Sequence, residues 1–286
     1  MKVFFIGNRT PVFDAAQALG LKIIKTLAVP NSFLSRKLAG TSFEFSELSN
    51  PQTLIEEIGD TEFDLLISNG CPHLLPVTTL KKKWQTFVNV HPSLLPDLKG
   101  RNPVNGALLF DRPLGATCHI MDDGVDTGPA ISSVPIEIDE GLDLGLAYQL
   151  AFLAEADAFK MAFQRNFEPL KANPHLGIDP VYFTRKELDL FVNWHENIDQ
   201  IIRRVSAFSV PGQLARFQVD GKLFTVARAE KVSSAYIQSK FKAHPNHRIV
   251  LAYDQSLLIK LPDGYIKFSG LEGDMRSIAC GDIMHG

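Results

Sequence analysis

The stretch Thr86-Phe-Val-Asn-Val-His-Pro-Ser-Leu-Leu-Pro96 opens with an apolar run typical of a β-strand and continues into two prolines. Proline lacks a backbone N–H and fixes its own φ angle, so Pro92 and Pro96 end the strand. Asn89 and His91 therefore lie near its carboxyl end. In open α/β sheets ligands bind at this edge, because the loops there carry reactive groups without disturbing the sheet.

A carboxylate follows later in the chain, at Asp126 within Asp122-Asp-Gly-Val-Asp-Thr-Gly128. Asn89 offers a neutral amide donor, His91 an imidazole and Asp126 a carboxylate. Transfer of an acyl group to an amine needs donors for a developing oxyanion and an acceptor for the amine proton. The three side chains therefore fit that chemistry.

The first half of the chain alternates short apolar runs with helix-like segments, which indicates parallel strands joined by crossover helices. The expected strands are 3–6, 21–27, 63–67 and 86–90, with helices at 13–19 and 51–58. Two further strands, 116–121 and 130–138, flank the Asp126 loop, and a helix at 143–163 packs on the sheet. This pattern predicts a Rossmann-like α/β domain with a mostly parallel sheet.

Segment 166–180 contains three prolines and a glycine that interrupt any regular period, so we expect a linker there. It would divide a catalytic domain, 1–180, from a smaller domain, 181–286. After it, a helix at 197–208 precedes period-two strands. These strands are expected at 213–219, 222–229, 248–253 and 257–260. A small β-barrel-like domain with one helix would accommodate them.

Composition predicts an ordinary soluble protein, since 45 % of the 286 residues are hydrophobic and 21 % are charged. No run approaches the roughly 18 apolar residues of a membrane span, and the N-terminus reads as a strand rather than a signal peptide, so we expect a cytoplasmic protein. Cys71, Cys118 and Cys280 are odd in number and widely spaced, which favours neither disulfides nor a metal site.

Charge is divided unevenly. Residues 1–180 carry 15 Lys and Arg against 21 Asp and Glu, whereas residues 181–286 carry 14 against 11. The small basic excess of the second part suits a phosphorylated ligand but is weak for a protein that grips a polynucleotide.

Four motifs resemble the signature of folate-dependent formyltransferases. They are Asn89-Val-His-Pro-Ser-Leu-Leu-Pro96, Lys99-Gly-Arg-Asn-Pro103, Gly115-Ala-Thr-Cys-His119 and Asp122-Asp-Gly-Val-Asp-Thr-Gly128. The segment from Phe183 to Gly212, with Trp194, is similar to the C-terminal domain of methionyl-tRNA formyltransferases and nucleotide-sugar N-formyltransferases. The resemblance implies that N10-formyltetrahydrofolate donates a formyl group to a primary amine, without a metal.

Under that resemblance Asn89 and His91 donate to the oxyanion, and Asp126 accepts the amine's proton and raises the His91 pKa. Replacing Asn89, His91 or Asp126 by alanine should then lower turnover severely. His119 is expected to support the site as a buried ring.

Two segments are expected to form the walls of a pterin pocket. The resemblance places one at Cys71, Pro72, His73, Leu74 and Leu75. Cys71, Pro72 and His73 depart from the small and aromatic residues usual in the family, and Leu74 and Leu75 would also suit a helix core. The other wall is the main chain of Asp122, Asp123, Gly124 and Val125, although the two aspartates would also suit a surface turn.

The acceptor is expected to contact Arg9, Ser93, Lys99, Arg101 and Asn102. Lys99 and Arg101 form a short basic loop suited to phosphates or to the folate glutamate tail, and an arginine fork suits paired oxygens. The alternative is that these are solvated charges and that Gly7-Asn-Arg-Thr10, which lacks Gly-x-Gly-x-x-Gly, is only a turn. This turn and the second domain disfavour a glycinamide ribonucleotide formyltransferase.

Several acceptors remain open. A nucleotide-linked amino sugar is preferred, because the Lys-Gly-Arg-Asn-Pro form of the loop looks more like that of sugar N-formyltransferases. Methionyl-tRNA comes second, since tRNA binding would predict a more basic surface. A hydrolase that releases formate would use the same three residues, and a folate-binding protein without catalysis would not need them intact. The edges of a barrel could also support a homodimer.

Overall fold

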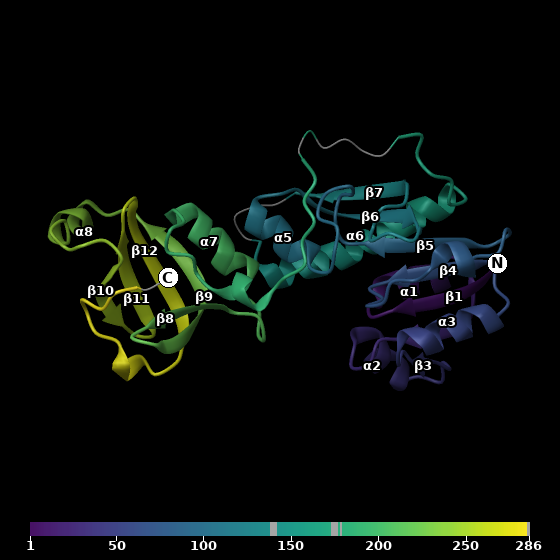
Figure 1. Ribbon diagram of the computed structural model, residues 1–286, viewed down its shortest axis with the longest axis horizontal. Coiled ribbons are helices and arrows are strands. Elements are labelled where there is room, and N and C mark those ends of the chain that lie inside the picture. Colours follow the sequence, from purple (N-terminus) through teal and green to yellow (C-terminus); the bar gives the residue numbers. More distant parts are fainter. Residues whose placement is uncertain (138–141, 173–176, 178, 285–286) are drawn as a thin grey trace. The chain divides into compact units, whose positions relative to one another are not determined.

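The computed structural model describes residues 1–137, 142–172, 177 and 179–284, which form two compact units, each with its own sheet (Figure 1). The first unit contains Met1–Pro103, Pro113–Asp139 and Tyr148–Thr184, and the second contains Val104–Arg112, Glu140–Ala147 and Arg185–Gly286. Part of the expected linker, residues 173–176 and 178, lies outside the described residues, as does Ile138 of the expected strand 130–138.

A seven-stranded sheet with the order β3-β2-β1-β4-β5-β6-β7 forms the centre of the first unit (Figure 1). The pairs from β3 to β5 are parallel, whereas β6 is antiparallel to β5 and β7. Its strands are β1 (Lys2–Gly7), β2 (Lys22–Ala28), β3 (Ser46–Glu47), β4 (Leu65–Asn69), β5 (Thr86–His91), β6 (Leu114–Ile120) and β7 (Ala130–Ile136). The expected mostly parallel α/β architecture is confirmed.

Helices cover both faces of this sheet. They are α1 (Pro11–Ala18), α2 (Phe33–Ala39), α3 (Pro51–Asp60), α4 (Val77–Leu80) and α6 (Leu144–Gln164). One core cluster joins strand residues to α1, α2 and α6, and the other joins strand residues to α3 and α4. Strands covered on both faces are apolar throughout, which explains the continuous hydrophobic runs in the sequence.

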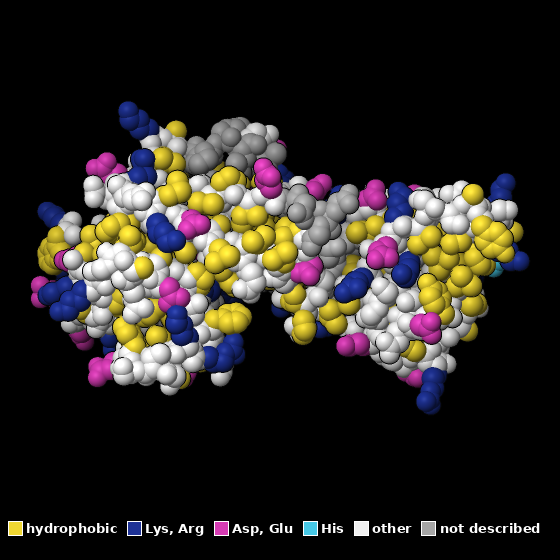
Figure 2. Space-filling model, turned by 180° about the vertical axis from the view of Figure 1, so that it is seen from behind, with side chains coloured by type: hydrophobic (Ala, Val, Ile, Leu, Met, Phe, Trp, Pro, Cys, Tyr) yellow, Lys and Arg dark blue, Asp and Glu magenta, His cyan; other side chains and the backbone are white. Residues whose placement is uncertain are grey.

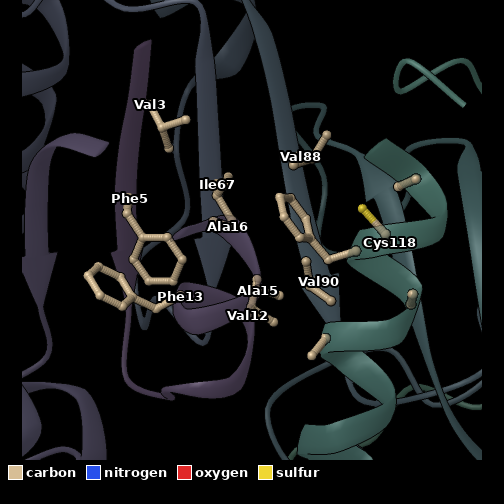
Figure 3. Packing of buried hydrophobic residues seen from close by; sticks show 14 of the residues in the cluster. Val3, Phe5, Val12, Phe13, Ala15, Ala16, Ile67, Val88, Val90 and Cys118 are labelled. Atoms are coloured by element: carbon tan, nitrogen blue, oxygen red, sulfur yellow. The ribbon is translucent and has the colours of Figure 1, made fainter. Parts of the chain in front are cut away.

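Alternation along β1 illustrates this packing. Val3 and Phe5 point into the cluster with α1, and Phe4 and Ile6 point into the opposite one. Figure 3 shows the Phe5 ring beside that of Phe13 in α1, and their centroids lie 5.2 Å apart edge to face. Val88 and Val90 of β5 belong to the same cluster, so the strand that carries Asn89 and His91 is anchored in the core.

The second unit is built on an antiparallel sheet with the order β10-β11-β12-β9-β8. Its strands are β8 (Ala215–Val219), β9 (Lys222–Val232), β10 (Arg248–Tyr253), β11 (Ser256–Leu261) and β12 (Gly264–Glu272), and its helices are α5 (Pro103–Phe110), α7 (Ile198–Ala207) and α8 (Ala235–Lys240), with short 3-10 turns η1 (Glu187–Leu190) and η2 (Met275–Ser277). Asn197 begins α7 by accepting from the Gln200 N–H at 2.9 Å. Among the described residues, no helix is both long and apolar enough to cross a membrane.

Trp194 lies in the core of the second unit. It is 4 % exposed and packs against Phe217 and Phe268, with ring centroids 6.3 and 5.8 Å away. The indole ring is therefore a core side chain.

Candidate active site

Asn89, His91 and Asp126 meet at the carboxyl end of β5. Asn89 and His91 belong to β5, and Asp126 lies in the loop between β6 and β7 with a φ of 52°, a left-handed conformation that aspartate adopts more readily than most residues. Its Oδ1 is 3.2 Å from Asn89 Nδ2, and its Oδ2 is 3.5 Å from His91 Nδ1. The structure thus brings together the three residues that the sequence singled out.

The partners of the His91 ring fix its tautomer. Nε2 lies 3.0 Å from the carbonyl oxygen of Leu98, which can only accept, so Nε2 carries a hydrogen. In the neutral ring Nδ1 then keeps its lone pair and faces Asp126. The Nδ1 to Oδ2 distance of 3.5 Å is longer than a charge-assisted hydrogen bond, as expected when no proton lies between the two atoms.

The side-chain amide of Asn89 is oriented by its neighbours. Its Nδ2 donates to Asp126 Oδ1 and lies 3.1 Å from His119 Nε2. His119 Nδ1 lies 2.8 Å from the Ile120 carbonyl oxygen and therefore carries the ring's hydrogen, which leaves Nε2 as an acceptor. The buried His119 ring thus fixes the direction of the Asn89 amide, as a supporting ring would.

Gly100 supplies a further donor to the carboxylate of Asp126, since its N–H lies 3.0 Å from Oδ2. Gly100 has a φ of 108°, and a Cβ there would lie 2.5 Å from the Phe183 carbonyl oxygen. Only glycine fits both conditions without strain. The lack of a side chain at Gly100 therefore allows the backbone of the Lys-Gly-Arg motif to approach Asp126.

The pKa values of Asp126 and His91 differ from the ordinary values of these side chains. Burial by itself raises the pKa of Asp126, but the His119 and His91 rings and the Gly100 N–H together lower it to about 2. The Asn89 amide and the Gly100 N–H donate to the two carboxylate oxygens of Asp126. Burial lowers the pKa of His91, and the opposing charge of Asp126 does not overcome it. The charge of Asp126 acts in the expected direction, but desolvation of the ring outweighs it, so the net change in the His91 pKa is a decrease.

A cavity of about 440 Å³ opens onto these residues, and its walls come from the first unit. Most of the residues expected to bind donor or acceptor line it, namely Arg9, Cys71, Pro72, His73, Leu74, Leu75, Arg101, Asp122, Gly124 and Val125, together with Asn89, His91 and Asp126. Leu74 is 58 % exposed and Val125 40 %, so two apolar side chains border the opening. Segment 71–75 is not helical, which removes the helix alternative for Leu74 and Leu75, but Leu75 is buried in a core cluster.

Asp123 and Ser93 do not line the cavity, contrary to expectation. The carboxylate of Asp123 accepts from the N–H and hydroxyl of Thr78, which ties the Asp122–Gly128 loop to α4. The hydroxyl of Ser93 is buried and donates to the Asp97 carbonyl oxygen at 2.8 Å. Both side chains are used in holding loops together.

Lys99 and Asn102 also lie outside the cavity wall. The main chain of Lys99 pairs with a segment near the end of the first unit, donating to the Val181 carbonyl and accepting from the Phe183 N–H. The same segment brings Tyr182 to the cavity. Of the basic loop, Arg101 is the residue that faces the cavity, and its guanidinium donates to the Pro72 carbonyl oxygen at 3.1 Å.

Sequence reasoning missed Glu155, which forms an ion pair with Arg9. Glu155 lies on α6 and is fully buried, and its Oε1 is 2.5 Å from Arg9 Nη1. The Arg9 guanidinium also lies over the ring of Phe152, 4.7 Å from its centroid. A single acid in Leu-Ala-Glu-Ala, on the apolar side of a helix, was the available signal. Burial raises the pKa of Glu155 to about 7 despite the charge of Arg9.

Replacing Glu155 by Gln is expected to change how stability depends on pH. Because the folded-state pKa is raised, the folded protein binds this proton more tightly than the unfolded chain, and the wild type loses stability as pH rises from about 4 to 8. The loss specific to Glu155 is on the order of 3 kcal/mol. Urea unfolding of both proteins at pH 4 to 8 measures it. A constant difference between the two would contradict the raised pKa.

Within residues 1–137, 142–172, 177 and 179–284, no group of three or more His, Cys, Asp or Glu side chains is placed to hold a metal ion. The polar groups that meet at the end of β5 are the Asn89 amide, the His91 and His119 imidazoles and the Asp126 carboxylate.

Comparison with known proteins matches two regions of the chain. Residues 5–159 match the family model "Formyl transferase", and residues 185–282 match "Formyl transferase, C-terminal domain". The chain is 30 % identical over 228 residues to a methionyl-tRNA formyltransferase of Acidiphilium cryptum, which covers 78 % of this chain and 67 % of that protein.

Solved structures are similar in fold. An N-formyltransferase from Helicobacter canadensis, in complex with folinic acid and dTDP-3-aminofucose, has a TM-score of 0.70 at 17 % identity and covers 95 % of this chain and all of that one. A sugar N-formyltransferase from a Shewanella species has a TM-score of 0.64 at 17 % identity, covering 82 % of this chain and 99 % of the other.

Proposed function

Because the chain belongs to the formyl transferase family, with both the N-terminal and the C-terminal region of that family, we propose that it moves a formyl group from N10-formyltetrahydrofolate to the primary amine of a nucleotide-linked amino sugar. The observation that carries the proposal is the cluster of Asn89, His91 and Asp126 in the wall of a cavity of about 440 Å³. A cavity of this size suits a ligand of ordinary cofactor dimensions.

Asn89 donates a hydrogen bond to the oxygen of the formyl group. As the amine attacks the formyl carbon, negative charge develops on that oxygen, and the Asn89 amide is a neutral donor fixed in direction by Asp126 and His119. Its 3.2 Å bond to Asp126 is at the long end of the range and can be exchanged for a shorter one to the oxyanion. Loss of one such donor raises comparable barriers by about 3 kcal/mol.

His91 accepts the proton of the amine. Its Nδ1 has a free lone pair, and its lowered pKa keeps the ring neutral at pH 7, so it can accept the proton that the attacking nitrogen must lose. Asp126, with a pKa of about 2, is a poor base but stays ionised and stabilises the imidazolium that forms. His91 then returns the proton to the departing nitrogen of tetrahydrofolate. This assignment gives His91 the role of base that the sequence suggested for Asp126, and it leaves Asp126 an electrostatic role.

The donor is proposed to lie between segments 71–75 and 122–125. Leu74 and Val125 expose apolar surface at the cavity, and an aromatic pterin ring would cover it. The polar main chain of Asp122 and Gly124 would face the ring's edge. The site fits this co-substrate, which supplies the formyl group.

Two arginines of the cavity support a phosphorylated acceptor. Arg9 and Arg101 both line it, and their planar groups suit the paired oxygens of a phosphate. The sugar N-formyltransferases of similar fold point the same way. Methionyl-tRNA is the second candidate, because a relative at 30 % identity carries that name. On the face drawn in Figure 2, Lys and Arg side chains are interspersed with Asp and Glu, whereas a tRNA-binding surface is usually continuously basic.

The release of tetrahydrofolate from N10-formyltetrahydrofolate tests the proposal. We expect release to require dTDP- or UDP-linked 4-amino or 3-amino sugars, and not to occur with methionyl-tRNA. Release with methionyl-tRNA alone would favour the second candidate, and release without any amine would indicate a hydrolase. Absence of release with every acceptor would contradict formyl transfer.

A further inference from the structure

Arg9 belongs to a group of four polar side chains at one wall of the cavity, three of which have no role in the proposed mechanism. Arg9 and Asn8 follow β1 and line the cavity, Asn69 ends β4, and Glu155 comes from α6. The side-chain amide of Asn69 lies close enough to Glu155 to lower its pKa, and the Asn8 N–H donates to the Asn69 carbonyl oxygen. These four residues are called the Arg9–Glu155 group below.

Arg9 is held from one side. Its Nη1 donates to Glu155, and its plane lies over Phe152, one helical turn earlier in α6. The side chain is 13 % exposed, and it lies close enough to His91 for its charge to lower the His91 pKa. Of its five N–H groups, Glu155 takes one within the described part of the chain. Arg9 thus presents donors and a positive charge to the cavity while its position is fixed by α6.

The Arg9–Glu155 group is short of hydrogen-bond donors. The Oε2 of Glu155 and the Oδ1 atoms of Asn8 and Asn69 are buried, and none has a donor within the described residues. Within the described residues Arg9 donates to Oε1 of this buried carboxylate, and the nearby Asn69 amide lowers its pKa without giving Oε2 a hydrogen bond, so the charge is incompletely compensated. A proton on Oε2 would remove the buried negative charge and supply one donor. Protonation would also remove the charge that balances Arg9. Because Arg9 lines the cavity, an anionic ligand bound there could balance it instead.

We propose that Glu155 is a positioning residue for formyl transfer: it holds Arg9 against the cavity wall, and it takes up a proton when an anionic group of the acceptor binds to Arg9. This inference rests on the proposed function for its ligand, the pyrophosphate of a nucleotide sugar. Binding and protonation are reciprocally linked, so each favours the other. The proton comes from solvent, and no covalent bond to the acceptor is made or broken.

Other titratable groups near Arg9 and Glu155 are not expected to take up a proton between pH 7 and 9. His91, on β5, has a lowered pKa and is neutral above pH 7, and Asp126 has a pKa of about 2. The pKa of Cys71 is raised from 9.0, so its thiol is uncharged in the same range. Glu155, which lies behind the cavity wall, changes charge in this range, because burial raises its pKa to about 7.

Calorimetric titration with dTDP-glucose tests the inference. This probe lacks the reacting amine, and its pyrophosphate diester keeps a constant charge between pH 6 and 9. We expect wild type to take up protons on binding, seen as a dependence of the binding enthalpy on the ionisation enthalpy of the buffer at pH 7.5. We also expect its affinity to fall by about tenfold between pH 6 and 9, which corresponds to a rise of one unit in the Glu155 pKa on binding.

The Glu155→Gln variant imitates the protonated state. It should bind dTDP-glucose with an affinity that is independent of pH and at pH 9 about tenfold tighter than wild type, with little proton uptake. In turnover, its acceptor KM should change with kcat nearly unaltered. Asp157→Asn is the matched control, because Asp157 is an exposed acid two residues further along α6. It should behave as wild type. Arg9→Gln should weaken binding about tenfold or more at pH 6.

Binding of dTDP-glucose to wild type that is independent of pH and buffer would overturn the inference, as would the absence of binding. The wild-type measurement stands even if Glu155→Gln does not fold. The two proposals fail separately. Proton-linked binding without tetrahydrofolate release would contradict the proposed function but support the linkage between Glu155 and anion binding. Amino-sugar turnover with pH-independent binding would support the proposed function and contradict the linkage.

Discussion

Replacement of His91 by Ala is expected to lower kcat for formyl transfer by about 10³-fold to 10⁴-fold. The change removes the nitrogen that accepts the amine's proton, and general base catalysis contributes effects of this size. It also removes the group that Asp126 stabilises. Because the ring must be neutral, kcat/KM of the wild type should fall as pH drops through the His91 pKa, which lies below its ordinary value. The variant should lack that acid limb.

His195→Ala is the matched control for this change, since His195 is exposed in the second unit. Both variants should give the circular dichroism spectrum of the wild type, and only His91→Ala should lose activity in the tetrahydrofolate assay. A correctly folded His91→Ala protein within tenfold of wild-type kcat would exclude His91 as the base.

Replacement of Asp126 by Asn should lower kcat by about 10²-fold to 10³-fold with little change in folding. The amide keeps the size of the side chain but removes the charge that stabilises the imidazolium. Each unit by which the His91 pKa falls when this charge is removed corresponds to about 1.4 kcal/mol of lost stabilisation of the imidazolium. Since the pKa of Asp126 is about 2, the carboxylate is ionised at every pH above about 3, and the loss should persist across that range.

The His91 pKa measured by nuclear magnetic resonance should be lower in Asp126→Asn than in the wild type. Asp123→Asn provides the control, because Asp123 belongs to the same loop but its carboxylate is bonded to Thr78 and does not line the cavity. Wild-type kcat in Asp126→Asn would refute the electrostatic role. An unchanged His91 pKa would show that the two side chains do not interact in solution.

Local signals in the sequence were sufficient to place the first three residues of the site. The apolar run of β5 ends at prolines, which fixed Asn89 and His91 at a strand end, and the Asp-Thr-Gly turn identified the loop of Asp126. The alternation of apolar runs likewise predicted β1, β2, β4 and β5, because parallel strands covered on both faces have few polar positions.

Long-range effects were beyond the sequence pattern. The pKa of His91 depends on how completely the ring is desolvated, and this outweighs the rise that the Asp126 charge contributes. Ser93 looked available next to two catalytic residues, but its partner Asp97 makes it part of the loop's internal bonding. Neither burial nor partner can be inferred from spacing.

Glu155 and α5 show the same limit. Glu155 lies 146 positions from Arg9, and only the packing of α6 against the sheet brings them together. The segment of α5, Pro-Val-Asn-Gly-Ala-Leu-Leu-Phe, is short and apolar on all sides, so it has no helical period to recognise. In both cases tertiary contacts decide what the local sequence leaves open.

Mass spectrometry of the acceptor after incubation with isotopically labelled N10-formyltetrahydrofolate tests the central claim most directly. We predict that a dTDP- or UDP-linked amino sugar gains one labelled formyl group on its amine nitrogen, in equal amount to the tetrahydrofolate formed, and that His91→Ala abolishes the product. Label recovered as free formate, or only on methionyl-tRNA, would contradict the assignment of a nucleotide-linked amino sugar as the acceptor.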